Sequence, residues 1–207
     1  MGPCTPPHRW ATRVAWLLAL LAASPALSTL GADSAWRVAR GDVRVVCPMT
    51  VGGSFEARTS AIQGTVTTGG AGAPLVGELS VDLAALDTGI GMRNEHMKKN
   101  YLEVGRGQGF DHAVLSQIRL GDADPQGIQG KTPFTGTFLL HGTTQAVSGQ
   151  ATIRREGKDV RVEASFPVTI SAFGIEKPQY LGVGVRDQVT VNVSLTAEPS
   201  DAAGATP

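Results

Sequence analysis

The chain has 207 residues, of which 42% are hydrophobic, 17% charged and only 5% aromatic, and its 18 basic residues equal its 18 acidic ones. A balanced charge offers no basic surface to hold a phosphate backbone, so the composition argues against a nucleic-acid-binding protein. It also excludes a collagen, a coiled coil and an acidic disordered chain.

Residues 1–28 have the pattern of a secretory signal peptide. Arg9 and Arg13 precede an unbroken apolar run at 14–23, and small residues follow at 26–28. This run is shorter than the roughly 20 apolar residues that a membrane-spanning helix needs. We therefore expect cleavage after Ser28 and a periplasmic or secreted protein, with no integral membrane segment in its mature chain.

The mature chain would contain a single thiol, Cys47, because Cys4 leaves with the signal peptide. No internal disulfide is then available. Cys47 precedes a proline in a strand-like segment, and we interpret it as a buried, inert thiol. A lone thiol outside the cytoplasm could instead pair with that of a second copy, which leaves a homodimer open.

Apolar and polar residues alternate with a period of two through most of the mature chain. The alternation begins at Val43 and Val45 and returns in the segments 75–83, 114–120, 134–140, 147–153, 160–170 and 189–195. Such segments are typical of strands with one apolar and one polar face. Because glycine-rich or polar turns separate them, the pattern predicts an antiparallel sandwich or barrel.

Two segments depart from this alternation. Residues 87–103 carry Ile90, Met97 and Tyr101 at helical spacing, which predicts one short helix there. Residues 197–207 show no apolar pattern, and we expect a disordered tail after a barrel at 35–196.

The apolar faces of the predicted strands are expected to point inward. An outer-membrane barrel turns them outward and adds aromatic girdles, whereas the only mature tryptophan is Trp36 and the only tyrosines are Tyr101 and Tyr180. The polar faces carry charged residues such as Arg161 and Glu163, which suit bulk water. A closed barrel of this kind has room for packed side chains or for one ligand.

The small inward residues, among them Gly77, Gly136 and Gly149, favour a cavity suited to an aliphatic ligand. The wall residues that we expect to contact it are Val45, Leu79, Val81, Val114, Phe138, Val162, Phe166 and Val191. The alternative is a filled interior, in which case the protein would be a ligand-free structural or stress-related module acting through its surface.

Asp87-Thr88-Gly89 also spells the triplet of aspartic proteases. That chemistry needs two carboxylates sharing a proton, so we prefer a strand-end turn in which Asp87 caps the following helix. A hydrolase using Asp87 or His96 is the least favoured hypothesis, because no nucleophile lies beside either residue in the sequence. We expect no enzymatic activity and no cofactor, and no histidine pair has the spacing of metal ligands.

Several segments resemble, in the right order, the signatures of the YceI-like, polyisoprenoid-binding proteins. They are Asp87-Thr88-Gly89 with Arg93-Asn94-Glu95-His96-Met97, the glycine- and threonine-containing stretch 136–145, the stretch 166–175, and Val185-Arg186-Asp187-Gln188-Val189. The resemblance runs from about Trp36 to Leu195. It implies an all-β fold, namely an eight-stranded antiparallel lipocalin-like barrel with one short helix. It also implies export by a bacterium and a pore that holds a long isoprenoid or fatty-acyl chain.

Departures from the signatures at Cys47-Pro48-Met49, Ala57, Thr59, Asp111 and Ala172 leave the identity of the lipid open. On the predicted helix, Arg93 and His96 are candidates for contact with a polar lipid head group, since arginine pairs well with phosphate or carboxylate. The structural alternative pairs Arg93 with Asp87 and hydrogen-bonds His96 to a loop carbonyl.

Overall fold

The structure is a computed structural model that describes residues 34–68, 75–121, 129–180 and 183–200. The predicted signal peptide at 1–28 lies outside these ranges. Eleven strands occur within them. Their bounds are β1 Ser34–Pro48, β2 Ser54–Thr59, β3 Ile62–Thr68, β4 Val76–Asp82, β5 His112–Leu120, β6 Gly130–Leu140, β7 Thr143–Glu156, β8 Asp159–Thr169, β9 Gln179–Tyr180, β10 Val183–Gly184 and β11 Gln188–Ser200.

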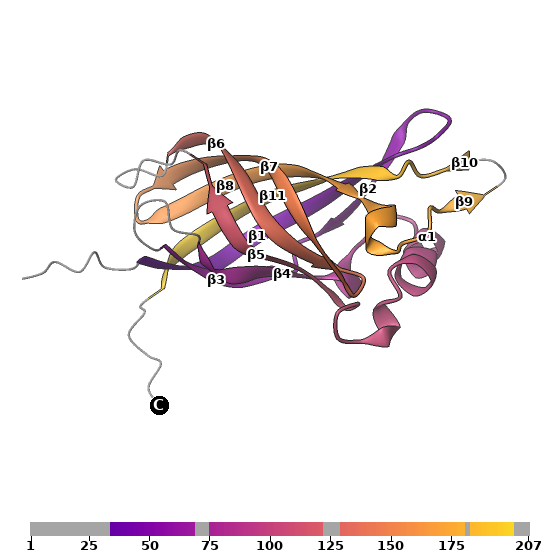
Figure 1. Cartoon of the computed structure of the whole chain (residues 1–207), viewed down its shortest axis with the longest axis horizontal. Helices are drawn as coiled ribbons and strands as arrows, with labels where there is room; N and C mark the ends of the chain where they lie inside the picture. Colours follow the sequence, from indigo (N-terminus) through magenta and orange to yellow (C-terminus); the bar gives the residue numbers. More distant parts are fainter. Residues whose placement is uncertain (1–33, 69–74, 122–128, 181–182, 201–207) are drawn as a thin grey trace, which may run out of the picture. The chain divides into compact units, whose positions relative to one another are not determined.

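The long strands form one antiparallel sheet that closes on itself (Figure 1). The order is β11-β8-β7-β6-β5-β4-β3-β1, and β11 pairs with β1 to complete the ring. β2 and β3 pair with the same edge of β1, through Val43 opposite Thr59 and Trp36 opposite Val66, so they are two halves of one bent strand. The described chain is therefore a closed eight-stranded antiparallel barrel, as the sequence predicted.

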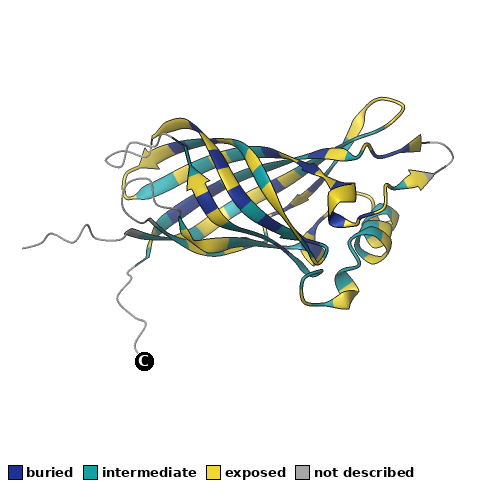
Figure 2. Ribbon diagram, viewed as in Figure 1, coloured by how far each residue is buried: buried dark blue, intermediate teal, exposed yellow. Residues whose placement is uncertain are grey.

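The two faces of each strand differ in burial (Figure 2). On β6, Phe134, Phe138 and Leu140 are buried, whereas Lys131, Pro133 and Thr135 on the opposite face of the strand are exposed. The apolar faces point into the barrel and the polar faces outward, as predicted, because only the interior removes apolar side chains from water. Apolar and polar residues alternate less regularly along β2 and β3, so the period of two does not predict these two strands.

Short helical pieces lie at one end of the barrel and define what we call the mouth (Figure 1). They include α1 at Gly91–His96, the π-helical turn η2 at Met97–Tyr101 and the 3₁₀ turn η3 at Val104–Arg106. Two further 3₁₀ turns are η1 at Leu83–Ala85 and η4 at Ile170–Phe173, and the β9–β10 ribbon lies at the mouth as well. No helix in the described ranges has the length and apolar character needed to cross a membrane.

The opposite end of the barrel is filled by side chains. Phenylalanine rings run along the interior in edge-on contacts, with centroids 5.8 Å apart for Phe134 and Phe166 and 5.6 Å apart for Phe138 and Phe166. A Cβ atom on Gly149 would lie 2.8 Å from the Phe134 ring, so this glycine makes room for the ring. A Cβ on Gly136 would similarly lie 3.0 Å from Leu115. The expectation that inward glycines leave space for a ligand is therefore wrong at these two positions.

The last strand extends four residues beyond the predicted end of the barrel at 196. β11 runs to Ser200, and its pairing with β1 continues as far as Ala35 opposite Ser200. The prediction that the tail begins at 197 is wrong for residues 197–200, because their backbone groups find partners on β1 despite the weak apolar pattern. Residues 201–207 lie outside the described ranges.

Candidate functional site

A cavity of about 980 Å³ occupies the barrel between the phenylalanine rings and the mouth. This volume lies at the upper end of the roughly 300–1,000 Å³ typical of small-molecule pockets. Its wall is almost wholly aliphatic or aromatic. Every strand around the barrel except β7 contributes to it, and so does α1. The strand residues of the wall include Val43, Val45, Ala57, Ile62, Leu79, Val81, Ala113, Leu115, Phe138, Leu140, Phe166, Val168, Val189, Val191 and Val193.

The polar side chains that line this cavity gather at the mouth. Apart from Cys47, the polar lining residues that the structure describes are Arg93, His96, Asn100, Tyr101 and Gln179. The first four lie along one side of the helical segment, because positions i, i+3, i+7 and i+8 fall on the same stripe of a helix. The cavity is thus apolar along its depth and polar at its opening, an arrangement that matches a molecule with a long apolar tail and one polar end.

Arg93 is held over an aromatic ring. Its guanidinium carbon lies 4.5 Å from the centroid of Phe55 on β2, within the range of a cation–π contact. Phe55 and Arg93 both line the cavity, so the contact leaves the positive charge at the opening. The predicted structural alternative, an Arg93–Asp87 pair, is wrong because Asp87 has other partners.

Asp87 anchors the start of the mouth helix instead of capping it. Its Oδ1 accepts hydrogen bonds from the backbone N–H of Gly89 at 2.8 Å and from Nδ2 of Asn94 at 2.6 Å. Asn94 Oδ1 in turn accepts from the backbone N–H of Thr88 at 2.8 Å. The N-cap of α1 is Ile90, which makes no side-chain cap, so the predicted capping role of Asp87 is wrong.

These hydrogen bonds account for the charge state of Asp87. The bond from Asn94, followed by that from Gly89, lowers the pKa of the Asp87 carboxyl below its ordinary value of 3.8. The backbone of Asp87 also pairs with Arg58 through two hydrogen bonds of 2.8 Å, which ties the segment to β2. Asp87 therefore positions the mouth helix through its Oδ1 atom and its backbone.

The far end of the mouth segment is tied down at Glu103. Nε2 of His141 lies 3.1 Å from Oε2 of Glu103, and its Nδ1 lies 3.0 Å from the carbonyl oxygen of Phe173. Arg106 donates to the same Glu103 oxygen at 2.7 Å, and this bond is the largest cause of the lowered pKa of Glu103. The segment that carries the polar lining is consequently fixed to the barrel at both ends.

Cys47 lies on the cavity wall and is only partly exposed. Burial raises the pKa of its thiol to about 11, and the nearby charge of Arg93 opposes this rise. The thiol is thus protonated and weakly reactive at neutral pH. This placement favours the buried, inert interpretation over pairing between two chains.

The structure brings most of the predicted site residues together. Val45, Leu79, Val81, Phe138, Phe166 and Val191 lie on the cavity wall, and Arg93 and His96 lie at its mouth. Val114 and Val162 are absent from the wall. Val162 points inward but belongs to the filled half of the barrel, where it packs with both apolar clusters.

The prediction that Val114 faces the cavity is wrong because β5 contains a bulge. Two residues of β5, Gln117 and Ile118, lie opposite the single residue Gly136 of β6, and Gln117 has a positive φ of 49°. The extra residue switches the inward face, so Ile118 points inward after the bulge whereas Ala113 and Leu115 do so before it. Extending the pattern of Ile118 backward assigned Val114 to the wrong face.

Sequence reasoning missed several lining residues. Asn100 and Tyr101 follow Arg93 and His96 at helical spacing, and that spacing is a signal that could have identified them. Gln179 and Phe55 come from irregular or weakly alternating segments and offer no local signal. No group of three or more His, Cys, Asp or Glu side chains that could hold a metal ion occurs in the described ranges.

The fold and this cavity define a class of protein, namely closed antiparallel barrels with one apolar interior pocket that opens at a short helix. The chain matches the YceI-like domain over residues 33–197 and belongs to that family. No curated protein matches the chain.

Solved structures with the same fold come from several bacteria. BcnA of Burkholderia cenocepacia is 20% identical, with a TM-score of 0.60 over 75% of this chain and 95% of its own. A polyisoprenoid-binding domain from Saccharophagus degradans is 16% identical, with a TM-score of 0.60 over 80% of this chain and 98% of its own. The YceI protein of Campylobacter jejuni is 13% identical, with a TM-score of 0.51 over 70% and 85% of the two chains. At these levels of sequence identity, the similarity shows a shared fold and does not by itself show a shared ligand.

Proposed function

We propose that this chain is an exported, non-enzymatic carrier or store that holds one long-chain isoprenoid or fatty-acyl lipid in its barrel. The observation that carries the proposal is the cavity of about 980 Å³, apolar along its depth and polar only near Arg93, His96, Asn100, Tyr101 and Gln179. Membership of the YceI-like family, and the fold shared with a polyisoprenoid-binding domain from Saccharophagus degradans, support the same class of ligand.

The energetics of burial favour a long apolar chain over a small polar metabolite. Each buried methylene contributes about 0.8 kcal/mol, so a chain of roughly fifteen to twenty carbons gains about 12–16 kcal/mol. Association itself costs on the order of 4–15 kcal/mol. A long chain can therefore bind by burial alone, whereas a short metabolite would need polar partners that the depth of the cavity does not offer.

The polar end of the lipid would lie at the mouth. Arg93 can form charge-assisted hydrogen bonds with a carboxylate or a phosphate, while its stacking on Phe55 keeps the guanidinium at the opening. Asn100, Gln179 and His96 add further hydrogen-bonding groups beside it. This arrangement sets the direction of the ligand, with its tail toward Phe138 and Phe166.

Export is part of the proposal. It is supported by the charged start, the apolar run at 14–23 and the small residues at 26–28. The protein would then meet its lipid in the periplasm or outside the cell. A homodimer is not needed for binding, since one barrel supplies the whole cavity.

Native mass spectrometry of the protein purified without detergent from the extracytoplasmic fraction of its own host tests the proposal. We expect an added mass in the range of a long-chain lipid, and uptake of a long-chain fatty acid by the stripped protein. A ligand-free mass together with no uptake of either a fatty acid or an isoprenoid alcohol would overturn the proposal. That result would favour the alternative of an interaction module acting through its surface.

A further inference from the structure

Exposed apolar side chains surround the mouth of the barrel. The exposed fractions are 67% for Val51, 49% for Ile90, 72% for Met92 and 38% for Val183. We call these four residues the apolar collar. The fifth large exposed hydrophobic side chain of the described residues, Val76 at 66%, lies at the start of β4, near the opposite end of the barrel. Exposed apolar surface is thus concentrated where the cavity opens.

The collar residues come from three separate parts of the chain that meet at the mouth. The hairpin between β1 and β2 lies against β10, because the backbone N–H of Thr50 donates to the carbonyl oxygen of Gly184 at 2.8 Å. Ile90 and Met92 belong to the start of α1, and they line the same cavity as Val183. Three collar residues are therefore both exposed to water and part of the cavity lining, so the apolar wall continues onto the outer surface.

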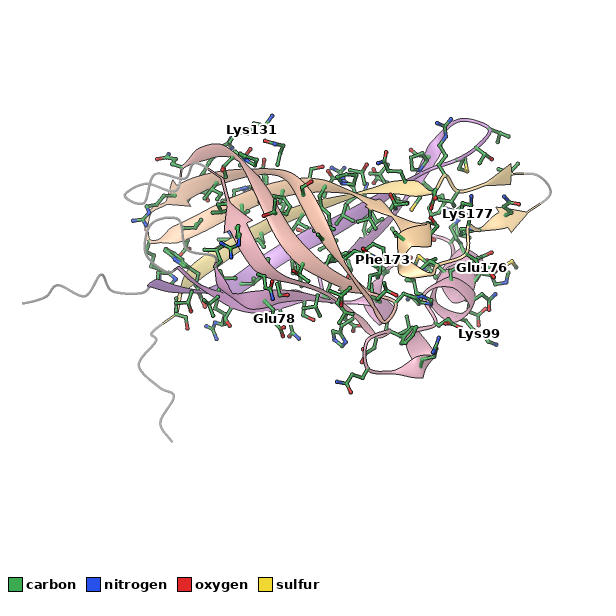
Figure 3. All side chains as sticks on the ribbon, in the orientation of Figure 1. Glu78, Lys99, Lys131, Phe173, Glu176 and Lys177 are labelled. Carbon is green, nitrogen blue, oxygen red and sulfur yellow. The ribbon has the colours of Figure 1, made fainter. Side chains whose placement is uncertain are left out.

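Basic residues flank this collar. Figure 3 shows Lys99 and Lys177 at the mouth end, together with Glu176. The segments 90–101 and 176–187 contain five basic side chains against three acidic ones, although the whole chain has 18 of each. The hairpin that carries Val51 has no charged residue between 48 and 54. The two segments that carry Ile90, Met92 and Val183 thus combine exposed apolar groups with a positive excess, as surfaces that bind anionic membranes do.

We propose that the apolar collar docks the barrel, mouth first, onto the surface of a bilayer that contains anionic lipids. This inference rests on the proposed lipid-carrying function and adds the place where the lipid enters and leaves. With the collar inserted among the lipid head groups, an acyl chain passes between the bilayer and the cavity without crossing water. Among the described residues, the ring of Phe134 and its neighbours fill the opposite end and leave no such path there.

The matched pair Val51→Asp and Val76→Asp tests the role of the collar. The two valines are almost equally exposed, and neither lines the cavity. Full-length wild type and variants are sedimented with phosphatidylcholine vesicles that contain phosphatidylglycerol, so any contribution of residues 1–33 is common to all. We expect Val51→Asp to lower the bound fraction about tenfold and Val76→Asp to leave it unchanged. Equal effects of the two substitutions would overturn the proposal.

A second pair tests the charge. We expect the double variant Lys99→Glu/Lys177→Glu to weaken vesicle binding about tenfold or more, and Lys131→Glu, at the closed end of the barrel, to have little effect. Binding of the wild type should also fall when phosphatidylcholine replaces phosphatidylglycerol. Binding that is indifferent to the anionic lipid would contradict the proposal.

Loading of a soluble fluorescent fatty acid, measured without vesicles, separates this inference from the proposed function. If Val51→Asp loads the probe normally and still binds vesicles like the wild type, docking through the collar is wrong and the carrier function stands. If the wild type binds vesicles but takes up neither a fatty acid nor an isoprenoid alcohol, the carrier function fails. Should Val51→Asp instead dissociate a dimer in light scattering, the collar is a contact between two copies and membrane docking is wrong.

Discussion

Arg93 stacks on Phe55 at the mouth of the barrel, with 4.5 Å between its guanidinium carbon and the ring centroid. The contact joins α1 to β2 and holds a positive charge beside the cavity. The same charge acts on Cys47, whose thiol pKa burial raises to about 11 while Arg93 opposes the rise. Arg93 thus places a positive charge at the mouth of the cavity and also acts on the thiol of Cys47 in the cavity wall.

We predict that Arg93→Met slows alkylation of Cys47. Loss of the cation removes the only effect that lowers the pKa of this thiol, so the pKa rises further and less thiolate forms. At about pH 10 we expect the rate with iodoacetamide to fall about two- to fivefold, since each pKa unit is tenfold in the thiolate fraction.

The measurement uses a chain in which Cys4 is replaced by serine, so that only Cys47 reacts. Arg93→Lys serves as the control, because it keeps the charge. A faster reaction in Arg93→Met would show that the arginine shields the thiol sterically and not through its charge. A saturating fatty acid should also slow the wild-type reaction, because its chain would cover Cys47 on the wall.

A second prediction concerns Val81 and Val114, which lie on neighbouring strands but on opposite faces of the barrel. Val81 faces the cavity and pairs with Ala113, whereas Val114 pairs with Ser80 on the outer face. We expect Val81→Phe to weaken binding of the longest fatty acid about tenfold or more, since displacing a few methylenes forfeits about 0.8 kcal/mol for each. Val114→Phe should leave the affinity unchanged.

Fatty acids of increasing length, titrated against both variants, provide the measurement. A cavity shortened by Val81→Phe should show its loss mainly for the longer chains. A uniform loss over all lengths would indicate a general disturbance of the barrel instead of a narrower cavity. If both substitutions leave every affinity unchanged, the ligand does not occupy this part of the interior.

Much of the fold could be predicted because the apolar period is local and regular. In β6, apolar or small residues alternate with threonine from Phe134 to Phe138, and the burial of the strand follows that alternation through to Leu140. The bent strand formed by β2 and β3 could not be found in this way. Its inward positions include Ala57, Thr59 and Gly64, which are not strongly apolar, and the break at Ser60–Ala61 interrupts the alternation. Long-range pairing with β1 determines its path.

The site could be predicted in outline but not at its irregular points. Wall residues such as Leu79 and Val191 follow directly from alternation. Arg93 and His96 follow from their place on the predicted helix and from the family resemblance of residues 93–97. Val114 could not be assigned correctly, because a bulge depends on the partner strand and a non-glycine residue with positive φ gives no sequence signal. Gln179 reaches the mouth only through the path of the chain after η4.

The strain at Gln117 gives a third prediction. A left-handed conformation is costly for a residue with a side chain and costs glycine nothing. We expect Gln117→Gly to raise the free energy of unfolding by up to about 1 kcal/mol, and the β-branched Gln117→Val to lower it by about 1–2 kcal/mol. Urea denaturation measures both. If Gln117→Val proved as stable as the wild type, β5 would have to run without the bulge, and Val114 would then face inward.

The hydrogen bond between Asn94 and Asp87 gives a fourth prediction, about pH. This bond is the largest cause of the lowered pKa of Asp87. A carboxyl whose pKa is lower in the folded than in the unfolded chain stabilises the fold fully above the ordinary value of 3.8. That stabilisation is lost as the pH falls through the lowered folded value. Asn94→Ala should therefore lower the melting temperature at neutral pH by about 2–4 °C.

The pH profile distinguishes this effect from a simple packing defect. As the pH falls below the lowered pKa of folded Asp87, the carboxyl becomes protonated in both proteins. The gap in melting temperature between Asn94→Ala and the wild type should then narrow to the part that comes from the lost hydrogen bond with the backbone N–H of Thr88. Asn100→Ala, on the same helical segment but outside the hydrogen bonds of Asp87, is the control and should show a difference that does not depend on pH. A constant gap between Asn94→Ala and the wild type from neutral to acidic pH would contradict the assigned role. The carboxylate would then contribute nothing to anchoring the helix that carries Arg93 across the mouth.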